Sequence, residues 1–359
     1  MTSRPRNPSR VLATEPVLPA HRHTQAEITD TLAPLLSRPG RHRELMRRLH
    51  GAAGVDFRHL ALPLSDYPEL VTRPDAFDAT NAAFAQIALD LAERAVKGAL
   101  ATAGLQPEDV DVLLFTTVTG VAAPSVDALL VERVGLRPDV VRWPGFGLGC
   151  AGGAAGLARL DDHLTGHPDA VGLLVSVELC SLTLQPDDPS TANLVASGLF
   201  GDGATAVVLA GAERAAGRPG WDVLEHTSRL LPGSADALGW QIGSKGFRIV
   251  LSAGLPQVLR AHVGDDVRAF LHPHGGVADV DEWVVHPGGP KVLDAVVAAL
   301  DLPADALDAS RAALRASGNL SSSAVLHVLA GTERVPGRRA LVLGVGPGVS
   351  TETLLLEAR

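Results

Sequence analysis

Cysteine, lysine and aromatic residues are scarce in this sequence of 359 residues. The only cysteines are Cys150 and Cys180, too few for a disulfide framework, and this indicates a reducing compartment. Lysine occurs only at Lys97, Lys245 and Lys291, and the formal net charge is −9. No basic run or stripe is present, so we expect no nucleic-acid partner and no anionic membrane surface as a partner.

Long apolar runs are also missing. No segment is long and apolar enough to span a bilayer, which argues against stable membrane insertion. The first ten residues, MTSRPRNPSR, are basic but lack the apolar stretch of a signal peptide, and we expect them to be disordered. These absences favour a cytoplasmic globular protein. Its length suffices for one large domain or for two halves that share a core.

Short apolar runs rich in β-branched residues alternate with helical patterns along the chain. Over Ala83–Ala103, apolar residues recur at spacings of three and four, which predicts an amphipathic helix. Strands that alternate with helices predict an α/β fold with largely buried sheets. The runs that we expect to form buried strands are Val112–Val118, Val171–Val177, Ala204–Ala210, Trp283–Val285 and Ala340–Val345.

A weak internal repeat is consistent with two related halves. The segments that begin at Pro107 and Val277 both run from Asp-Val-Asp through a strand, a turn with proline and a helix to a Leu/Pro/Asp ending. Chance similarity between two amphipathic βα units explains this pattern equally well when it is taken alone. On the duplication hypothesis, the halves span residues 11–215 and 216–359, and matching helix N-termini in the two halves face one site.

Cys150 is a candidate nucleophile. Its context, GFGLGCAGGAAG, places glycines on both sides, which permits a tight strand-to-helix turn and the close approach of a ligand. The N–H groups and the dipole at a helix N-terminus favour a thiolate. For a cysteine taken alone, a buried structural role is the commoner alternative. Cys180, in VSVELCSLT, lacks the glycine setting, and we interpret it as a cavity-wall or core residue.

His286 and Asn319 could complete a reaction centre. His286 follows a strand in EWVVHPGGPKV and so lies at the carboxyl end of that strand, where open α/β sheets bind ligands, although a simple turn histidine is the alternative. Asn319, in ASGNLSSSAV, is either a helix N-cap or an amide donor to a thioester oxygen. With Cys150 they would supply a nucleophile, a base or donor, and a second donor for an oxyanion or enolate, without a metal. Neither GLGCAGG nor GVGPG fits a dinucleotide-binding fingerprint.

Five motifs together resemble the chalcone synthase-like type III polyketide synthases. The resemblance runs from about Val11 to the end of the chain, and the combination is highly specific although no single motif is. It is similar above all to bacterial members that make alkylpyrones or alkylresorcinols. The motifs are GLGCAGG around Cys150, LFGDGATAVV from Leu199, VVHPGGPKVLD from Val284, GNLSSSAV from Gly318 and LGVGPG from Leu343.

The resemblance implies a thiolase-like α/β fold, with duplicated βα halves in a five-layer αβαβα arrangement. It implies a homodimer in which Val121–Pro124 reaches the partner's cavity, and acyl-CoA and malonyl-CoA as substrates with no further cofactor. Cys150 would carry the starter and then the growing chain. His286 would keep the cysteine as a thiolate and, with Asn319, would stabilise the thioester oxygen and the enolate from malonyl-CoA. A medium or long fatty acyl starter is expected, with closure to an alkylpyrone or alkylresorcinol.

Other positions match substrate-contacting positions of the family. Phe200 matches a gate between the CoA tunnel and the cavity, and Ile249 stands where plant members have a second gate phenylalanine. Arg58 matches, more loosely, a basic residue that meets CoA phosphates. The remaining matches are the cavity-lining positions Thr119, Cys180, Thr183 and Ser321, and the cyclisation loop of Gly344, Val345, Gly346, Pro347 and Gly348, in which Val345 replaces a usual phenylalanine.

Two other functions deserve comparison with this one. A ketoacyl-ACP synthase III shares the fold and a Cys/His/Asn set, but HPGGPKV, the terminal GVGPG and the lack of a concentrated basic patch argue against it. A non-catalytic thiolase-fold partner subunit is disfavoured by the complete Cys/His/Asn set. Within the polyketide synthase interpretation the product stays open, because thin residues at cavity positions leave room for an acyl chain whereas neighbours such as Trp240 can refill that space.

Overall fold

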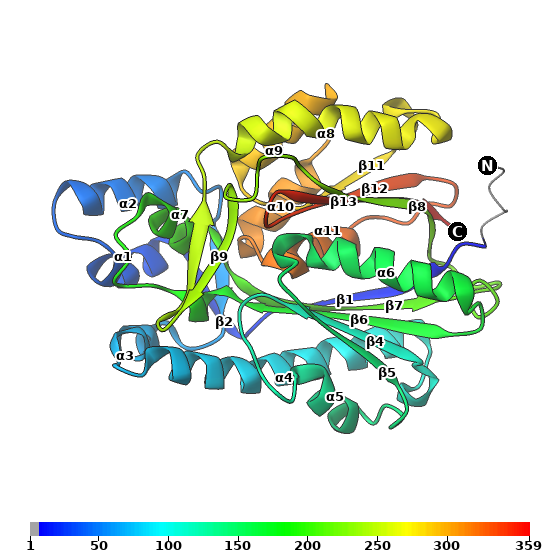
Figure 1. Cartoon of the computed structure of the whole chain (residues 1–359), viewed down its shortest axis with the longest axis horizontal. Helices are drawn as coiled ribbons and strands as arrows, with labels where there is room; N and C mark the ends of the chain where they lie inside the picture. The colour runs from blue at the N-terminus through cyan, green and yellow to red at the C-terminus, as the bar shows by residue number, and fades with distance from the viewer. Residues whose placement is uncertain (1–6) are drawn as a thin grey trace.

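Nine strands form one twisted sheet in the computed structural model, which describes residues 7–359 (Figure 1). The strands are β1 (Arg10–Val17), β4 (Val112–Thr117), β5 (Val141–Phe146), β6 (Val171–Leu179), β7 (Asp202–Ala210), β8 (Trp221–Leu230), β11 (Glu282–Val285), β12 (Arg339–Gly346) and β13 (Ser350–Ala358). Their order across the sheet is β11-β12-β13-β8-β1-β7-β6-β4-β5.

The sheet consists of two halves that share a four-strand pattern, and β5 extends the first half at its edge. In the first half β4 is parallel to β6, β6 is antiparallel to β7, and β7 is antiparallel to β1. In the second half β11, β12, β13 and β8 repeat these orientations in the same order. The halves join where Arg10 and Val11 of β1 pair with Asp222 and Trp221 of β8. This matched topology confirms the expected duplication of βα halves.

Helices fill three layers around the two halves of the sheet (Figure 1). Between the halves lie α6 (Gly152–Gly166) and α11 (Ala324–Ala330), whose apolar side chains share one core with strands of both halves. The outer face of the first half is covered by α4 (Ala76–Ala103) and α5 (Val126–Val134), and that of the second by α8 (Leu255–Leu271) and α9 (Pro290–Leu300). The result is the five-layer αβαβα arrangement that the resemblance implied.

The remaining helices and two small two-stranded sheets surround these layers. The small sheets are formed by β2 (His21–Thr24) with β3 (Phe57–Leu60) and by the hairpin of β9 (Leu238–Gly243) and β10 (Gly246–Leu251). The helices are α1 (Gln25–Leu36), α2 (Arg41–Gly51), α3 (Tyr67–Thr72), α7 (Thr191–Leu199) and α10 (Asp308–Ser317). Within residues 7–359, none of the helices is long and apolar enough to cross a membrane.

The predicted strands and the predicted helix are all present, several with longer bounds. Every residue of β6 and β7 is buried, as expected for strands covered on both faces. The helix predicted from Ala83 begins earlier, at Ala76, and ends at Ala103 because Gly104 adopts the left-handed conformation with φ 59°. Local apolar patterning therefore located these elements correctly, and their ends depended on residues outside the pattern.

The N-terminal segment departs from its prediction. Disorder through Arg10 is wrong for Ser9 and Arg10, whereas residues 1–6 lie outside the described residues. The Ser9 hydroxyl is buried and donates to Asp161 at 2.7 Å. Arg10 opens β1, and its Nε donates to Asp222 at 2.6 Å. A basic, polar segment is ordered here because carboxylates from distant parts of the chain partner it, and the local sequence does not reveal them.

The middle layer is tightest where α6 begins. A β-carbon added at Gly153 would lie 2.3 Å from the carbonyl oxygen of Ser322, and one added at Gly152 would lie 2.7 Å from Oγ1 of Thr116. Only glycine allows such an approach of backbone to backbone. The glycines that follow Cys150 thus bring the start of α6 against the turn Ser321–Ser323 of the second half.

Candidate active site

Cys150 lies in the short turn of 3₁₀ helix Gly149–Ala151 that leads into α6. The preceding residue, Gly149, has a φ of 49°, which lets the chain turn sharply from β5 into the helix. Cys150 is 9% exposed, and its thiol lies 3.6 Å from the hydroxyl oxygen of Ser321. The strand-to-helix turn expected at this cysteine is therefore present, and it faces the second half of the chain.

Asn319 approaches the same place from the second half. Its N–H donates to the carbonyl of Leu199 at 2.9 Å, and its own carbonyl accepts from the N–H of Gly201 at 3.0 Å. These bonds fix the backbone beside Phe200. The side-chain Oδ1 of Asn319 accepts from the N–H of Ser321 at 2.8 Å. The amide oxygen is thus occupied as in the capping interpretation, and this fixes the orientation of the NH₂ group.

His286 follows β11 directly, as the sequence predicts. Its N–H donates to Leu343 at 2.9 Å and continues the ladder between β11 and β12. The side chain is 2% exposed, and its Nδ1 has no hydrogen-bond partner among residues 7–359. The following turn packs towards the rest of the site, since a β-carbon at Gly289 would lie 3.6 Å from Leu199. An imidazole with an unoccupied buried nitrogen can act as a base or as a donor.

Burial opposes the thiolate that the sequence predicts at Cys150. Burial raises the pKa of the thiol to about 12, although hydrogen bonds from Ser321 and Asn319 act in the opposite direction. Burial also lowers the pKa of His286 to about 3, so the imidazole is neutral at pH 7. The desolvation of each ionised group outweighs the helix-terminus effect. Burial therefore favours a neutral thiol and a neutral imidazole in the free protein.

Sequence reasoning assigns no role to Glu178, yet this residue links the two halves at the site. Its side chain is fully buried, and burial raises the pKa of its carboxyl group. One carboxyl oxygen accepts from the hydroxyls of Thr119 at 2.8 Å and Thr117 at 3.2 Å. The other accepts from the hydroxyls of Ser322 at 2.5 Å and Ser321 at 3.2 Å. The available signal was a lone carboxylate inside the apolar strand VGLLVSVEL, where charge is rarely buried without partners.

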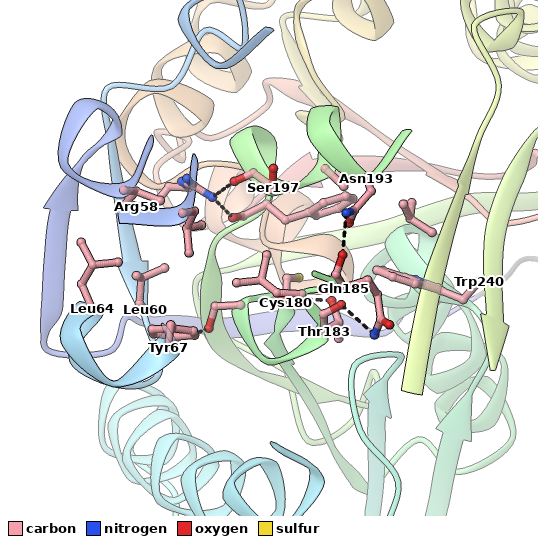
Figure 2. Close-up of a pocket in the computed structure, with 17 residues that line it drawn as sticks. Arg58, Leu60, Leu64, Tyr67, Cys180, Thr183, Gln185, Asn193, Ser197 and Trp240 are labelled. Carbon is pink, nitrogen blue, oxygen red and sulfur yellow. Dashed lines mark hydrogen bonds between the residues drawn. The ribbon is translucent and has the colours of Figure 1, made fainter. Parts of the chain in front are cut away.

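A narrow pocket lies beside this network and contains five of the predicted substrate-contacting residues (Figure 2). These are Phe200, Ile249, Cys180, Thr183 and Arg58, and Trp240 lines the pocket as well. The rings of Trp240 and Phe200 are 6.3 Å apart between centroids. The other lining residues come from α1, β3, α7, the region of α3 and the segment after β6, and just over half of them are apolar.

Two sets of predicted substrate-contacting residues lie outside this pocket. Thr119 and Ser321 bond to Glu178 rather than line this pocket. The loop Gly344–Gly348 packs against the turn at Cys150, because a β-carbon at Gly346 would lie 2.6 Å from Ala151. The side chain of Val345 is buried in the core of the second half with residues of α8 and α9, and its role in a cyclisation cavity stays a prediction.

The position of Arg58 does not support the expected contact with CoA phosphates. Arg58 is 2% exposed, and its Nη1 donates to the carbonyls of Ser197 at 2.7 Å and Phe200 at 2.9 Å. Alternate residues of β3 are buried, and Arg58 is one of them. The guanidinium therefore faces the interior of the protein, where Arg58 lines the pocket, rather than the solvent-exposed surface. The contact with CoA phosphates stays a prediction, because the loose local match carries no information on which face of the strand is buried.

Comparison with known proteins gives matches over almost the whole chain. The N-terminal domain of chalcone and stilbene synthases matches residues 1–213, and the C-terminal domain matches residues 222–358. The chain is 51% identical to a 1,3,6,8-tetrahydroxynaphthalene synthase from Streptomyces peucetius subsp. caesius, over 96% of this chain and 92% of that protein. It is 30% identical to an alpha-pyrone synthesis polyketide synthase-like protein from Mycobacterium tuberculosis, over 93% and 87% of the two chains.

The solved structures agree with the sequence matches. The crystal structure of the 1,3,6,8-tetrahydroxynaphthalene synthase from Streptomyces coelicolor A3(2), described as a bacterial type III polyketide synthase, superposes with a TM-score of 0.90. The two chains are 30% identical, and the match covers 98% of this chain and 99% of the other. The thiolase-like arrangement of layers is therefore shared along the full length.

Proposed function

Because the chain belongs to the chalcone and stilbene synthase family and is a type III polyketide synthase, an acyltransferase, we propose that it condenses malonyl-CoA on Cys150 and uses malonyl-CoA as its own starter. The observation that carries this proposal is the 51% identity to a tetrahydroxynaphthalene synthase over 96% of the chain. Family membership also removes the ketoacyl-ACP synthase III and the non-catalytic partner subunit as alternatives.

The product named for that relative sets the carbon count of the proposed reaction. Tetrahydroxynaphthalene contains ten carbons, which correspond to five two-carbon units. Five malonyl-CoA molecules provide them if each loses its carboxyl group, and the balanced reaction then releases five CO₂, five CoASH and one water. Four carbon–carbon bonds join the units, and two more close the rings, one by aldol condensation with loss of the water and one by Claisen condensation with loss of the last thiol.

The proposed steps use the three residues as follows. The Cys150 thiol passes its proton to the neutral imidazole of His286 as the sulfur attacks the thioester carbonyl of the starter. The departing CoA thiolate takes that proton back. His286 and Asn319 then donate hydrogen bonds to the enolate that forms when malonyl-CoA loses CO₂, and the enolate carbon attacks the thioester on Cys150. The fixed NH₂ group of Asn319 and the open Nδ1 of His286 support these roles. We propose no cofactor beyond the CoA thioesters.

A medium or long fatty acyl starter, with closure to an alkylpyrone or alkylresorcinol, is the second candidate. The apolar lining of the pocket, which includes Leu32, Leu60 and Leu64, favours it. So does the 30% identity to the alpha-pyrone synthesis protein. Against it, Trp240 occupies the pocket beside Phe200, as expected if a large side chain refills the space near the gate.

One experiment separates the two candidates. Purified protein is incubated with malonyl-CoA alone and, in parallel, with malonyl-CoA plus saturated acyl-CoAs of graded length, and products are identified by mass. We expect a ten-carbon aromatic product from malonyl-CoA alone and no product from the Cys150→Ala control. If malonyl-CoA alone gives no polyketide while longer acyl-CoAs give pyrones, the malonyl starter is wrong.

We also propose that the enzyme works in the cytoplasm as a homodimer; its two unpaired cysteines support the location.

A further inference from the structure

Arg58 has an unusual environment for an arginine. Its side chain is fully enclosed, and Nη1 is used by the backbone carbonyls of Ser197 and Phe200. The other two nitrogens, Nε and Nη2, are buried and have no hydrogen-bond partner within residues 7–359. Buried donors are almost always paired in folded proteins, and an unpaired donor on a charged group is costly. One edge of the guanidinium, formed by Nε and Nη2, is therefore unpaired within residues 7–359.

The neighbouring carboxylate does not neutralise Arg58 directly. Asp202 accepts from the N–H of Ala61 at 2.6 Å and from the N–H of Ser181 at 2.8 Å, and it also accepts from the Ser181 hydroxyl. Burial lowers the pKa of Arg58 to about 10, and the charge of Asp202 opposes this only in part. Arg58 therefore keeps its positive charge at pH 7 without a carboxylate bonded to it in the part of the chain described here.

Arg58 is one of the residues that line the pocket next to Cys180. Figure 2 shows Arg58 at one end of this pocket, together with Leu60, Leu64 and Tyr67, whereas Trp240 lies at the opposite end and Cys180 between them. The hydrogen on Nε and one hydrogen on Nη2 project side by side, because these nitrogens lie on the same edge of the planar group. That spacing matches the two oxygens of a carboxylate in a bidentate pair.

We propose that Arg58 is a specificity-determining residue that binds the free carboxylate of a malonyl-primed chain at this end of the pocket. The inference rests on the proposed function, because only a malonyl starter carries a carboxylate on the end of the chain remote from Cys150; the starter loses this group last, as the fifth CO₂. The carboxylate would accept from Nε and Nη2 and would satisfy both buried donors. A starter that ends in a methyl group leaves them unpaired, so the enzyme selects against it.

The test compares two starters of nearly equal size. Malonyl-CoA and propionyl-CoA differ by a carboxylate in place of a methyl group, and their products are distinguished by mass. Both are offered together, and the ratio of malonyl-primed to propionyl-primed product is measured for the wild type, Arg58→Met, Arg58→Lys and the exposed control Arg73→Met. The ratio does not depend on how much of each variant is folded.

We expect the ratio to fall at least ~10-fold in Arg58→Met, since hydrogen bonds to charged groups are lost. Arg58→Lys keeps the charge but lacks the two-donor edge, and its ratio should lie between those of Arg58→Met and the wild type. Arg73→Met should equal the wild type. An unchanged ratio in both Arg58 variants, with both starters reduced alike, would overturn the proposal and leave Arg58 a structural residue. A wild type that makes no malonyl-primed product would instead refute the proposed starter.

Discussion

Gly149, in the first half of the chain, lies directly against Pro347 in the second: a β-carbon added to Gly149 would be 2.5 Å from the proline ring. The contact joins the residue before Cys150 to the loop Gly344–Gly348. Gly149 also has a φ of 49°, which residues with side chains rarely adopt. The backbone that positions the candidate nucleophile is thus held by the opposite half of the molecule.

The first prediction follows from this contact. Gly149→Ala should shift the Cys150 turn, reduce turnover strongly and lower the free energy of unfolding by about 1–3 kcal/mol, since overpacking and an unfavourable φ act together. Gly166→Ala is the control, because nothing lies within 4 Å of the added carbon and its φ is ordinary. Turnover and denaturant unfolding are measured for both. Normal activity in Gly149→Ala would mean that the loop Gly344–Gly348 can shift to accept the added carbon without moving Cys150.

The second prediction concerns the reactivity of Cys150 in the free enzyme. Because burial raises the pKa of its thiol to about 12, the rate of alkylation by iodoacetamide should rise steadily between pH 6 and pH 9. Mass spectrometry locates the label, which Cys150→Ala should lose and Cys180→Ser should retain. A plateau of reactivity below pH 7 would indicate a stable thiolate–imidazolium pair with His286 and would contradict the neutral resting state.

The third prediction separates the two roles of Asn319. Asn319→Asp keeps an oxygen for the N–H of Ser321, now at 2.8 Å from Oδ1, but loses the NH₂ donor. Stability should change by about 1 kcal/mol or less, while the condensation rate should fall about 10²–10³-fold. Asn319→Ala should lose the capping hydrogen bond, and its condensation rate should fall as well. Near-normal condensation by Asn319→Asp would leave only the capping role.

The fourth prediction is a loss of stability in acid. Burial lowers the pKa of His50 and His286 to about 3 and that of His327 to about 4, each from 6.5. The unfolded chain binds these protons below pH 6.5 and the folded chain does not, so the stabilisation is complete above pH 6.5 and is lost as pH falls towards 4. Each histidine contributes a slope of at most about 1.4 kcal/mol per pH unit.

Denaturant unfolding at pH 7 and pH 5 checks this slope. His327→Gln should remove one histidine's share of it, and the exposed His272→Gln is the control. The difference between variant and wild type isolates the histidine from Glu178 and Asp202, whose raised pKa values act in the opposite direction. Equal slopes in His327→Gln and the wild type would show that this histidine is already protonated, or solvated, in the folded chain.

The fifth prediction concerns the homodimer. β5 is an edge strand, and its ends carry the exposed apolar side chains of Val141 and Phe146, each 48% exposed. Val121, in the stretch expected to reach the partner, is also exposed. An uncovered apolar edge favours association. Val141→Glu should shift the sedimentation of the protein from dimer to monomer, whereas Val335→Glu, at another exposed valine, should not. A wild-type protein that is a stable monomer at micromolar concentration would contradict the predicted homodimer.

The amino-acid sequence by itself determined the elements and the candidate reactive residues. The β-branched runs of β6 and β7 and the three- and four-residue spacing in α4 are local patterns, and burial of the matching faces follows from them. Likewise, the glycines around Cys150 and the HPGG turn after His286 allow only a few backbone shapes, so the positions of these side chains at strand and helix ends could be predicted.

Only the tertiary structure decided the environments of those side chains. Cys150 and Ser321 are separated by 171 positions in the chain, and Glu178 bonds to hydroxyls from both halves. Arg58 lies inside the protein because it is on the buried face of β3. Val345 lies in the core with residues of α8 and α9. Burial by distant segments likewise favours the neutral forms of Cys150 and His286. Local sequence limits backbone shape, whereas burial, charge and pairing depend on which distant segments exclude water from a group, and that is settled only when the halves pack.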